Sequence, residues 1–440
     1  MIQSKWGPWS LCIIALILLS IYNILLTARL MYGQECPKNF PEKHLQPAKS
    51  LQSSSSCILK QPTAERNTPL FNLNLDLGRW DNKMLYKLYD RIIIGDKYVE
   101  LSSTFFVCLA TQSSFERLYS LVQVSKNWLG PISTAVFAAG EDELNLVLLY
   151  MLYLRKCFPN IRDRVTFHLT LPKSRLPKNI ELDMQILKHE DCTSPENTLQ
   201  RLLLRRSATT DKWKIKNPYP QNHLRNLARK NCQSSYVFLT DVDIIPSEDL
   251  AESLNYFLSK VTCKTMCAYV IPTYEIDSRV RFPPNKTELV RLAHKGLARP
   301  FHQKVFIYNQ FATNFSRWQT VTPEDKEVHV SHPVTNFEFL YEPFYVAPDT
   351  APPHDERFIG YGYTRNTQVY EMFVAGYEFL VLSPVFTCHW GLQIKRGRPA
   401  WREYQNNLNR KYFETFKKEV FARYNKDPLK MMHQYKTPPF

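Results

Sequence analysis

Two kinds of segment alternate from about residue 100 onward, and this alternation limits the fold more than any other feature. Apolar runs of strand character occur at 103–110, 132–139 and 164–171. Helical patterns lie between them at 111–128 and 141–158, and the second has acids at its front and bases at its back, as a helix dipole favours. Strands that alternate with helices indicate βαβ units. The pattern therefore predicts an α/β fold with a mainly parallel sheet.

The strand that follows these units ends in two acids. Tyr236–Leu239 is a run of strand formers that leads into Asp241 and Asp243, with one valine between them. Alternate side chains of a strand share a face, so the pattern predicts both carboxylates on one side, where their like charges repel. Ligands of open α/β sheets bind beyond the carboxyl ends of the strands. A hard divalent cation with oxygen ligands would suit two carboxylates at such a place.

A D-x-D triplet has other interpretations when it stands alone. A solvated turn before a helix uses the same residue types, and Pro246 and Ser247 would suit the start of a helix. Phosphohydrolases with an aspartyl nucleophile also carry D-x-D after a strand, but usually near the start of their domain. Here three strand–helix units precede the triplet, which favours a metal site.

The amino-terminal part of the chain carries an apolar run. Residues 11–32 offer about 20 mostly apolar residues, enough to cross a bilayer as a helix. The run is long and has no good cleavage site, so it favours an uncleaved signal-anchor over a cleaved signal peptide. The sequence thus predicts a cytoplasmic tail at 1–10, a transmembrane anchor at 11–32, a stem and lead-in at 33–99, and a luminal domain at 100–440.

Two further features favour the secretory lumen for the large domain, although the charges that flank the apolar run do not decide its orientation. Asn285 and Asn314 each begin an N-x-S/T glycosylation triplet. The chain has 10 cysteines, which are compatible with disulfides, although buried free cysteines would explain them equally well.

The formal net charge of +15 is spread along the chain and forms no basic block. It argues weakly for anionic ligands or surfaces, and no nucleic-acid-binding motif is present, so nucleic acid is not expected as a partner.

Four motifs in order resemble glycosyltransferase family 49: "HLRNLARK", "YVFLTDVDIIPS", "HDERF" and "FTCHWG". The resemblance covers roughly residues 100 to 425. Within the family it is nearer to the single-domain β-1,4-glucuronyltransferases of the dystroglycan O-mannose glycan pathway than to the two-domain LARGE-type enzymes. It implies a GT-A-like nucleotide-sugar-binding fold, a type II anchor in the Golgi membrane, and a UDP-sugar donor with a glycan acceptor on a glycoprotein. It also leaves room for a complex with other Golgi glycosyltransferases.

The activity that the resemblance implies is inverting, Mn²⁺-dependent transfer of glucuronate from UDP-glucuronate to a β-xyloside, in β-1,4 linkage. Two alternatives stay open. The donor could be another UDP-sugar such as UDP-N-acetylglucosamine, because the side chains that choose the donor are not identified. The chain could also be a non-catalytic luminal lectin-like or scaffold member of the fold, although its full set of acids and histidine argues against this.

Roles for single residues follow from the resemblance. Asp241 and Asp243 would meet Mn²⁺ and UDP, with His389 as the third metal ligand. An inverting transfer also needs a carboxylate that takes the proton of the acceptor hydroxyl. Asp355 is favoured as this base and Glu356 as a holder of the acceptor or of an arginine, since only one of two adjacent side chains on an extended segment would face the pocket. A surface ion pair with Arg357 is the alternative interpretation of both acids.

Substrate-binding candidates lie on both sides of the D-x-D. Arg225, Asn226 and Arg229 share a predicted helix, where the arginines could grip a diphosphate or a glucuronate carboxylate. A packing role for this helix face is the alternative. Tyr361 and Gly362 could form an acceptor platform, because aromatic faces suit sugar rings, or a plain turn.

Overall fold

The computed structural model describes residues 17–25, 71, 73–320, 327–395, 397 and 399–432. The chain divides into two units, residues 1–67 and 68–440. In the first unit, residues 17–25 form a helix with exposed side chains. None of the described helices has the length and apolar character needed to span a membrane. Most of the predicted anchor lies outside the described residues, so it stays a prediction.

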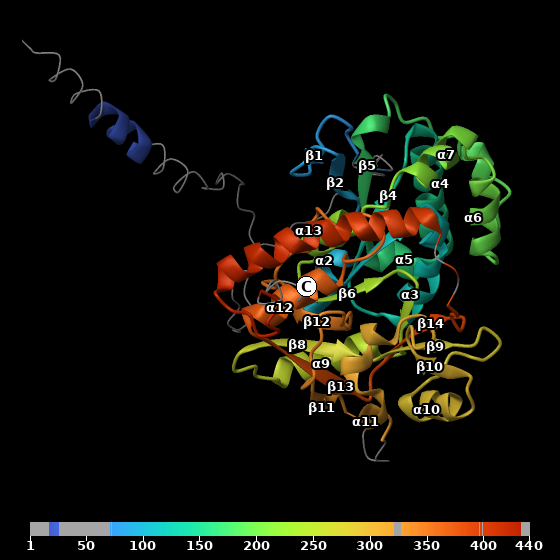
Figure 1. The fold of residues 1–440 in the computed structure, drawn as a ribbon. Coiled ribbons are helices and arrows are strands. Elements are labelled where there is room, and N and C mark those ends of the chain that lie inside the picture. Colours follow the sequence, from blue (N-terminus) through green and yellow to red (C-terminus); the bar gives the residue numbers. More distant parts are fainter. Residues whose placement is uncertain are drawn as a thin grey trace, which may run out of the picture. The chain divides into compact units, whose positions relative to one another are not determined.

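The second unit is built on a ten-stranded sheet (Figure 1). Across the sheet its strands are β1 (Arg79–Trp80), β2 (Tyr86–Ile93), β5 (Val165–Pro172), β4 (Ile132–Phe137), β3 (Val107–Ser114), β6 (Tyr236–Asp241), β12 (Phe344–Pro348), β8 (Met266–Ile271), β13 (Tyr377–Ser383) and β11 (His329–Pro333). A second sheet has the order β10 (Ala298–Pro300), β9 (Thr273–Ile276), β14 (Thr387–Trp390) and β7 (Ile244–Pro246).

The described helices of the second unit lie between and around these strands. They are α2 (Tyr98–Thr104), α3 (Leu121–Asn127), α4 (Glu141–Cys157), α5 (Pro159–Arg164), α6 (Pro195–Leu203), α7 (Ala208–Lys216), α8 (Gln221–Lys230), α9 (Leu250–Lys260), α10 (Lys286–His294), α11 (Phe315–Gln319), α12 (Asn366–Ala375) and α13 (Ala400–Tyr424). Short 3₁₀ turns occur at Phe115–Ser120, Lys173–Arg175, Met184–Leu187, Ile307–Asn309 and Phe311–Thr313.

The α/β class is confirmed, but the large sheet is mixed rather than mainly parallel. The strands β5, β4, β3 and β6 are parallel to their neighbours in this group, as is the pair β8 and β13. The five other pairings of the sheet are antiparallel. The departure has a topological cause, because β12 enters between β6 and β8 and runs against both. Sequence periodicity carries no information on such a long-range insertion.

The parallel strands lie between two layers of helices. Successive residues of β3 alternate between the layers, with Val107 and Leu109 in the cluster that contains α4, and Cys108 and Ala110 in the cluster that contains α8. Burial on both faces explains why these strands read as continuous apolar runs. The same burial accounts for the observed end of β3. This strand extends to Ser114, through residues that the sequence predicted as the start of a helix.

The interval expected to form stem and lead-in contributes two strands to the sheet. β2 pairs antiparallel with β5, and β1 pairs with β2. Disulfides join Cys108 to Cys232, Cys157 to Cys192, and Cys263 to Cys267, and Cys388 is free and buried. The first of these bonds joins β3 to the segment that follows α8, so it fastens α8 beside the parallel strands.

Candidate active site

The D-x-D triplet lies at the carboxyl end of a central parallel strand, as expected, but its two acids do not share that strand. Asp241 is the last residue of β6, whereas Val242 and Asp243 form the turn that leads into β7. The chain turns here because β7 leaves the large sheet and pairs with β14 of the small one. The alternation argument for Asp243 was therefore wrong, and a turn orients its carboxylate instead.

Asp241 is held by two arginines and an amide. Its Oδ1 lies 3.2 Å from an Nη atom of Arg225 on α8 and 3.0 Å from Nε2 of Gln112 on β3. Its Oδ2 accepts from Arg365, just before α12, at 2.8 Å. Burial alone would raise the pKa of Asp241, but the guanidinium groups of Arg365 and Arg225 hold that pKa well below its usual range. The positive partners that keep this half-buried carboxylate ionised are thus on the protein.

Asp243 and His389 form the more open part of the site. Nε2 of His389 lies 3.7 Å from Oδ2 of Asp243, and their side chains are 16% and 31% exposed. The pairing of β14 with β7 brings them together, since His389 is opposite Ile244. A carboxylate and an imidazole at this spacing, with solvent access, suit a divalent cation such as Mn²⁺. Asp241 would join them as a ligand on giving up part of its contact with the arginines.

A different trio has the tighter ligand spacing among the described residues. Ligand atoms of Asp81, His223 and Glu356 all lie within 4.8 Å of one another. The Asp81 carboxylate already accepts the backbone N–H groups of Leu85 and Tyr86, each at 2.6 Å. Nδ1 of His223 is buried without a partner, so a metal on Nε2 would leave a buried Nδ1–H unpaired. This trio fits a structural hydrogen-bond cluster better than a metal site.

His302 was missed by the sequence analysis and lies within the field of the predicted metal ligands. Its ring stacks on Phe301 with centroids 3.9 Å apart, and the Phe301 ring is 5.6 Å from that of His389. Burial and, to a smaller extent, the nearby His389 lower the pKa of His302 to about 4, against the opposing influence of Asp241 and Asp243. His302 also has a φ of 60°, a strained conformation for a residue other than glycine.

Glu342 was missed as well. It lies two residues before β12, and Nδ2 of Asn309 donates to its Oε2 at 2.9 Å. Burial raises the pKa of Glu342, the guanidinium groups of Arg365 and Arg225 oppose the rise, and the Asp241 carboxylate adds to it. Glu342 and Asp241 therefore share one pair of arginines. A carboxylate before an apolar strand gives no signal in a sequence unless the partner strand is known.

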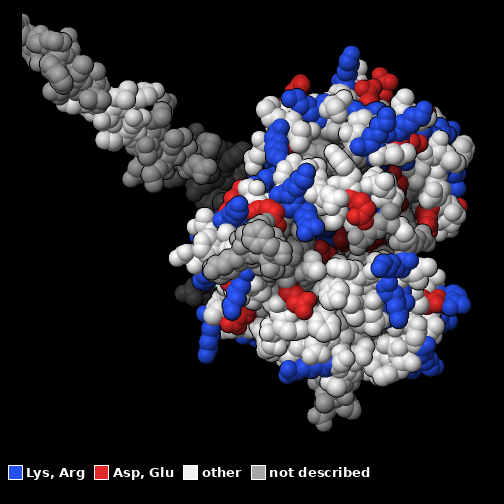
Figure 2. Space-filling view, in the orientation of Figure 1, with Lys and Arg blue, Asp and Glu red and all other residues white. Residues whose placement is uncertain are grey.

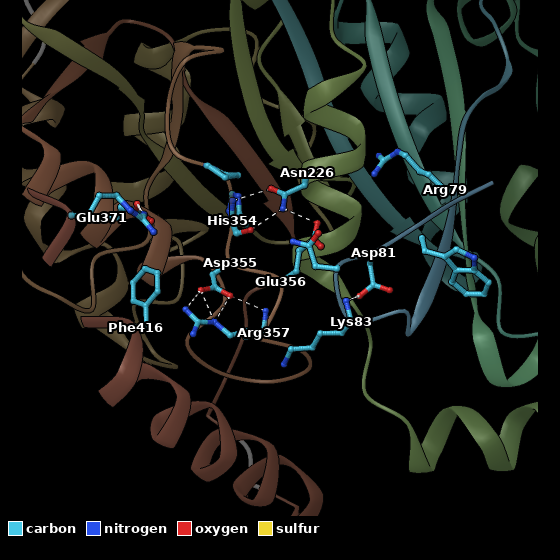
Figure 3. A pocket seen from close by; sticks show the side chains of 14 residues that line it. Arg79, Asp81, Lys83, Asn226, His354, Asp355, Glu356, Arg357, Glu371 and Phe416 are labelled. Atoms are coloured by element: carbon cyan, nitrogen blue, oxygen red, sulfur yellow. Dashed lines mark hydrogen bonds and ion pairs between the residues drawn. The ribbon is translucent and has the colours of Figure 1, made fainter. Parts of the chain in front are cut away.

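Asp355 and Glu356 lie elsewhere. Both line a cavity of about 610 Å³ together with Asn226, and the lining includes none of the three predicted metal ligands (Figure 3). Asp355 turns onto Arg357, whose Nε lies 3.0 Å from its Oδ1 and 2.9 Å from its Oδ2. Glu356 accepts from Nδ2 of Asn226 at 3.0 Å. The chain turns at Glu356, so both acids face this cavity, and their roles in catalysis stay predictions.

The predicted helix carrying Arg225, Asn226 and Arg229 is present as α8, and its side chains hold protein groups. Arg229 donates to Oδ1 of Asp349 at 3.0 Å and to the carbonyl of Pro352 at 2.9 Å. Asn226 bonds both backbone groups of His354, at 2.8 and 2.9 Å. These contacts fasten segment 349–356 along α8. Of the three residues, Arg225 is the one that reaches the D-x-D.

Tyr361 and Gly362 pack against α13. The amide of Asn409 donates to their carbonyl oxygens at 3.2 and 2.8 Å, and Arg402 lies over the Tyr361 ring at 4.6 Å. Gly362 has a φ of +85°, and a Cβ there would come within 2.3 Å of Asn406 Oδ1. The glycine is thus required by the turn and by the close approach of α13. The acceptor platform stays a prediction.

The two glycosylation triplets are placed at helix starts. Asn285 is exposed and accepts from the N–H of Glu288 as the N-cap of α10. Asn314 is exposed and accepts from the N–H of Arg317 as the N-cap of α11. Both side chains are accessible, so glycosylation at these positions stays a prediction.

Comparison with known proteins gives consistent matches. The family described as "Glycosyl-transferase for dystroglycan" matches residues 106–425. Human beta-1,4-glucuronyltransferase 1 is 34% identical over 73% of this chain and 77% of its own length. The zebrafish protein of that name is 29% identical over 80% and 83%. Human xylosyl- and glucuronyltransferase LARGE1 is 25% identical over 70% of this chain and 36% of its own length. This chain therefore belongs to the dystroglycan glycosyltransferase family and is a glycosyltransferase.

Proposed function

We propose that this glycosyltransferase transfers glucuronate from UDP-glucuronate to a β-xyloside acceptor, with inversion and in β-1,4 linkage, during O-mannosyl glycan synthesis on glycoproteins. The observation that carries the proposal is the cluster of Asp241, Arg225 and Arg365 at the carboxyl end of β6. It occurs in a chain 34% identical to human beta-1,4-glucuronyltransferase 1. The name of that relative supplies the donor and the linkage.

The fold proposed for this activity is of the GT-A type. The parallel strands β4, β3 and β6 and their helices on both faces support it, because nucleotides bind at the carboxyl ends of such strands. Two guanidinium groups at this edge provide the charge that a diphosphate or a glucuronate carboxylate requires. An arginine can bind either group bidentately.

Asp243, His389 and Asp241 are proposed to hold Mn²⁺. When bound, the ion supplies positive charge that stabilises the diphosphate as it leaves. Arg225 and Arg365 orient the Asp241 carboxylate and neutralise it in a buried place, where two unpaired acids would be costly. The acceptor's proton requires a separate carboxylate, for which Asp355 stays the candidate from sequence and Glu356 the candidate for holding the acceptor.

We also place this enzyme in the Golgi membrane, as a single-pass type II protein with its catalytic domain in the lumen. Three disulfides support an oxidising compartment. The apolar run at 11–32 and the exposed sequons support the membrane anchor and the luminal side. Complexes with other Golgi glycosyltransferases belong to the same proposal.

A donor screen tests the proposed function. Purified protein is incubated with Mn²⁺, a β-xyloside and one UDP-sugar at a time, and both UDP release and the mass of the product are measured. UDP-glucuronate should give acceptor-dependent UDP release and a glucuronosylated xyloside. Transfer from UDP-N-acetylglucosamine instead would show that this UDP-sugar, and not UDP-glucuronate, is the donor. Absence of UDP release with every donor would favour a non-catalytic role.

A further inference from the structure

We propose that Glu342 is the carboxylate that accepts the proton of the acceptor hydroxyl during transfer. The proposal rests on the transfer reaction above and assigns its base to a residue that lies in the D-x-D site. Four observations carry it: the place of Glu342 in the sheet, its charged neighbours, its freedom from strong ion pairs of its own, and the ion pair with Arg357 that occupies the competing Asp355.

The sheet brings Glu342 to the end of β6. β12 runs antiparallel to β6, with Tyr345 opposite Leu239 and Val346 opposite Phe238. In such a pair the entry of one strand lies beside the exit of the other. Glu342, which enters β12, therefore lies at the edge where Asp241 ends β6.

The neighbours of Glu342 are the groups that hold the D-x-D. Arg365 and Arg225 both act electrostatically on Glu342, and the same two arginines bond Asp241. Glu342 therefore belongs to the same cluster of charged groups as Asp241, at the edge of the sheet where transfer is proposed.

The carboxylate of Glu342 is held in position by hydrogen bonding rather than by an ion pair. Asn309 donates to Oε2, and the backbone N–H of Asn366, at the start of α12, faces the carboxylate. Asp355 differs, since Arg357 binds both of its oxygens and also Glu419. Both carboxylate oxygens of Asp355 are thus already engaged, and Asp355 would first have to release Arg357 before it could contact an acceptor hydroxyl.

The proposed transfer combines a displacement at the anomeric carbon of the donor with a proton transfer to Glu342. The acceptor oxygen forms a bond to the anomeric carbon of the donor sugar, and its proton passes to an oxygen of Glu342. The bond between the anomeric carbon and the β-phosphate oxygen breaks, and the electron pair leaves with UDP. Glu342 returns its proton to water after the products depart. No oxidant or further reactant is required.

A structural role is the competing explanation, because the contact with Asn366 could make Glu342 a cap of α12. An external nucleophile separates the two roles. Azide needs no deprotonation, so it can attack the anomeric carbon in an enzyme without a base and form a glycosyl azide with release of UDP. A variant that has lost only its base should still make this product, whereas one with a distorted site should not.

The experiment compares Glu342→Gln and Glu342→Ala with Asp355→Asn and Glu356→Gln in full-length protein, with Mn²⁺, UDP-glucuronate and a β-xyloside. Glu342→Gln should lower kcat for transfer to the hydroxyl by about 10² to 10⁴ while UDP binding is retained. Glu342→Asp, which keeps a carboxylate, should be more active than Glu342→Gln. Glu342→Ala in azide should form the glycosyl azide. The two control variants should lose less hydroxyl transfer than Glu342→Gln.

Three results would overturn the proposal. They are near-wild-type transfer by Glu342→Gln, equal loss of hydroxyl and azide transfer in Glu342→Ala, or a larger kcat loss in Asp355→Asn than in Glu342→Gln. Failure of the proposed function is recognised separately, in the wild type. If the wild type uses another UDP-sugar, the same variants are compared with that donor, and if it transfers no sugar, both proposals fall.

Discussion

A buried histidine illustrates how single residues of this fold depend on their protonation. His168 lies within β5, and the N–H of Arg91 donates to its Nδ1 at 2.8 Å. Its Nε2 lies 2.9 Å from the hydroxyl of Ser133, which in turn donates to the carbonyl of Ala228 at 2.6 Å. This series of hydrogen bonds requires a neutral His168 ring with its hydrogen on Nε2. A second proton on Nδ1 would oppose the N–H of Arg91.

Acid should therefore weaken the fold through His168. Burial lowers its pKa from the ordinary 6.5 to about 3, so between these values the unfolded chain binds a proton that the folded one does not. The contribution of His168 to the free energy of unfolding is complete above about pH 6.5 and is lost as the pH falls towards 3. Thermal unfolding of the wild type and of His168→Gln across this range measures it. The variant should be less stable at neutral pH but should lose less stability on acidification, and parallel curves would refute the assignment.

At the scale of elements, sequence patterns identified the segments that are local and missed the contacts that are not. The helix α4, the strands β4 and β5, and the helix α8 followed from periodicity and from charges at the helix ends. β12 has five residues and reaches its partner β6 from about a hundred positions further along the chain, so no periodic signal marks it.

The candidate site, too, could be predicted from the sequence only where its residues lie close together along the chain. Arg225 and Asp241 are 16 residues apart on adjacent elements, and their proximity follows from the helix–strand order. Arg365 and Glu342 reach Asp241 only through the insertion of β12 and the packing of α12, which a single sequence does not reveal. The segment at Asp355 was recognised by its motif, and an ion pair with the neighbouring Arg357 could be considered from the sequence, but only the structure shows that this pair forms.

The face of the molecule seen in Figure 2 carries charges of both signs. Figure 2 shows Lys and Arg scattered over the visible face, and acidic side chains within the hollow across its middle. The excess of basic residues, a net +15, is thus spread rather than gathered on this face. Acids within a hollow suit the binding of a cation better than the binding of an unaccompanied anion.

Luminal placement of the whole domain predicts N-glycosylation at Asn285, Asn314 or both. Glycosidase treatment of protein expressed in animal cells should increase its mobility on a gel. Because both asparagines cap helices, Thr287→Ala and Ser316→Ala are the better variants, since they remove the triplets and keep the caps. If a site is glycosylated, the variant that removes its triplet should lose the part of the mobility shift that this site contributes. Unchanged mobility after glycosidase treatment, together with protease sensitivity from the cytosolic side, would show that the domain faces the cytosol.

Metal-assisted transfer at the end of β6 can be tested in a single assay. Transfer of glucuronate to a β-xyloside is measured for the wild type with Mn²⁺, with EDTA, and with Mn²⁺ restored, beside Asp241→Asn and Asp243→Asn. We expect EDTA to abolish transfer and Mn²⁺ to restore it. Each variant should lose at least about two orders of magnitude, because the charge that stabilises the leaving diphosphate is lost. Full activity in EDTA, or near-wild-type transfer by both variants, would rule out metal-assisted transfer at this site.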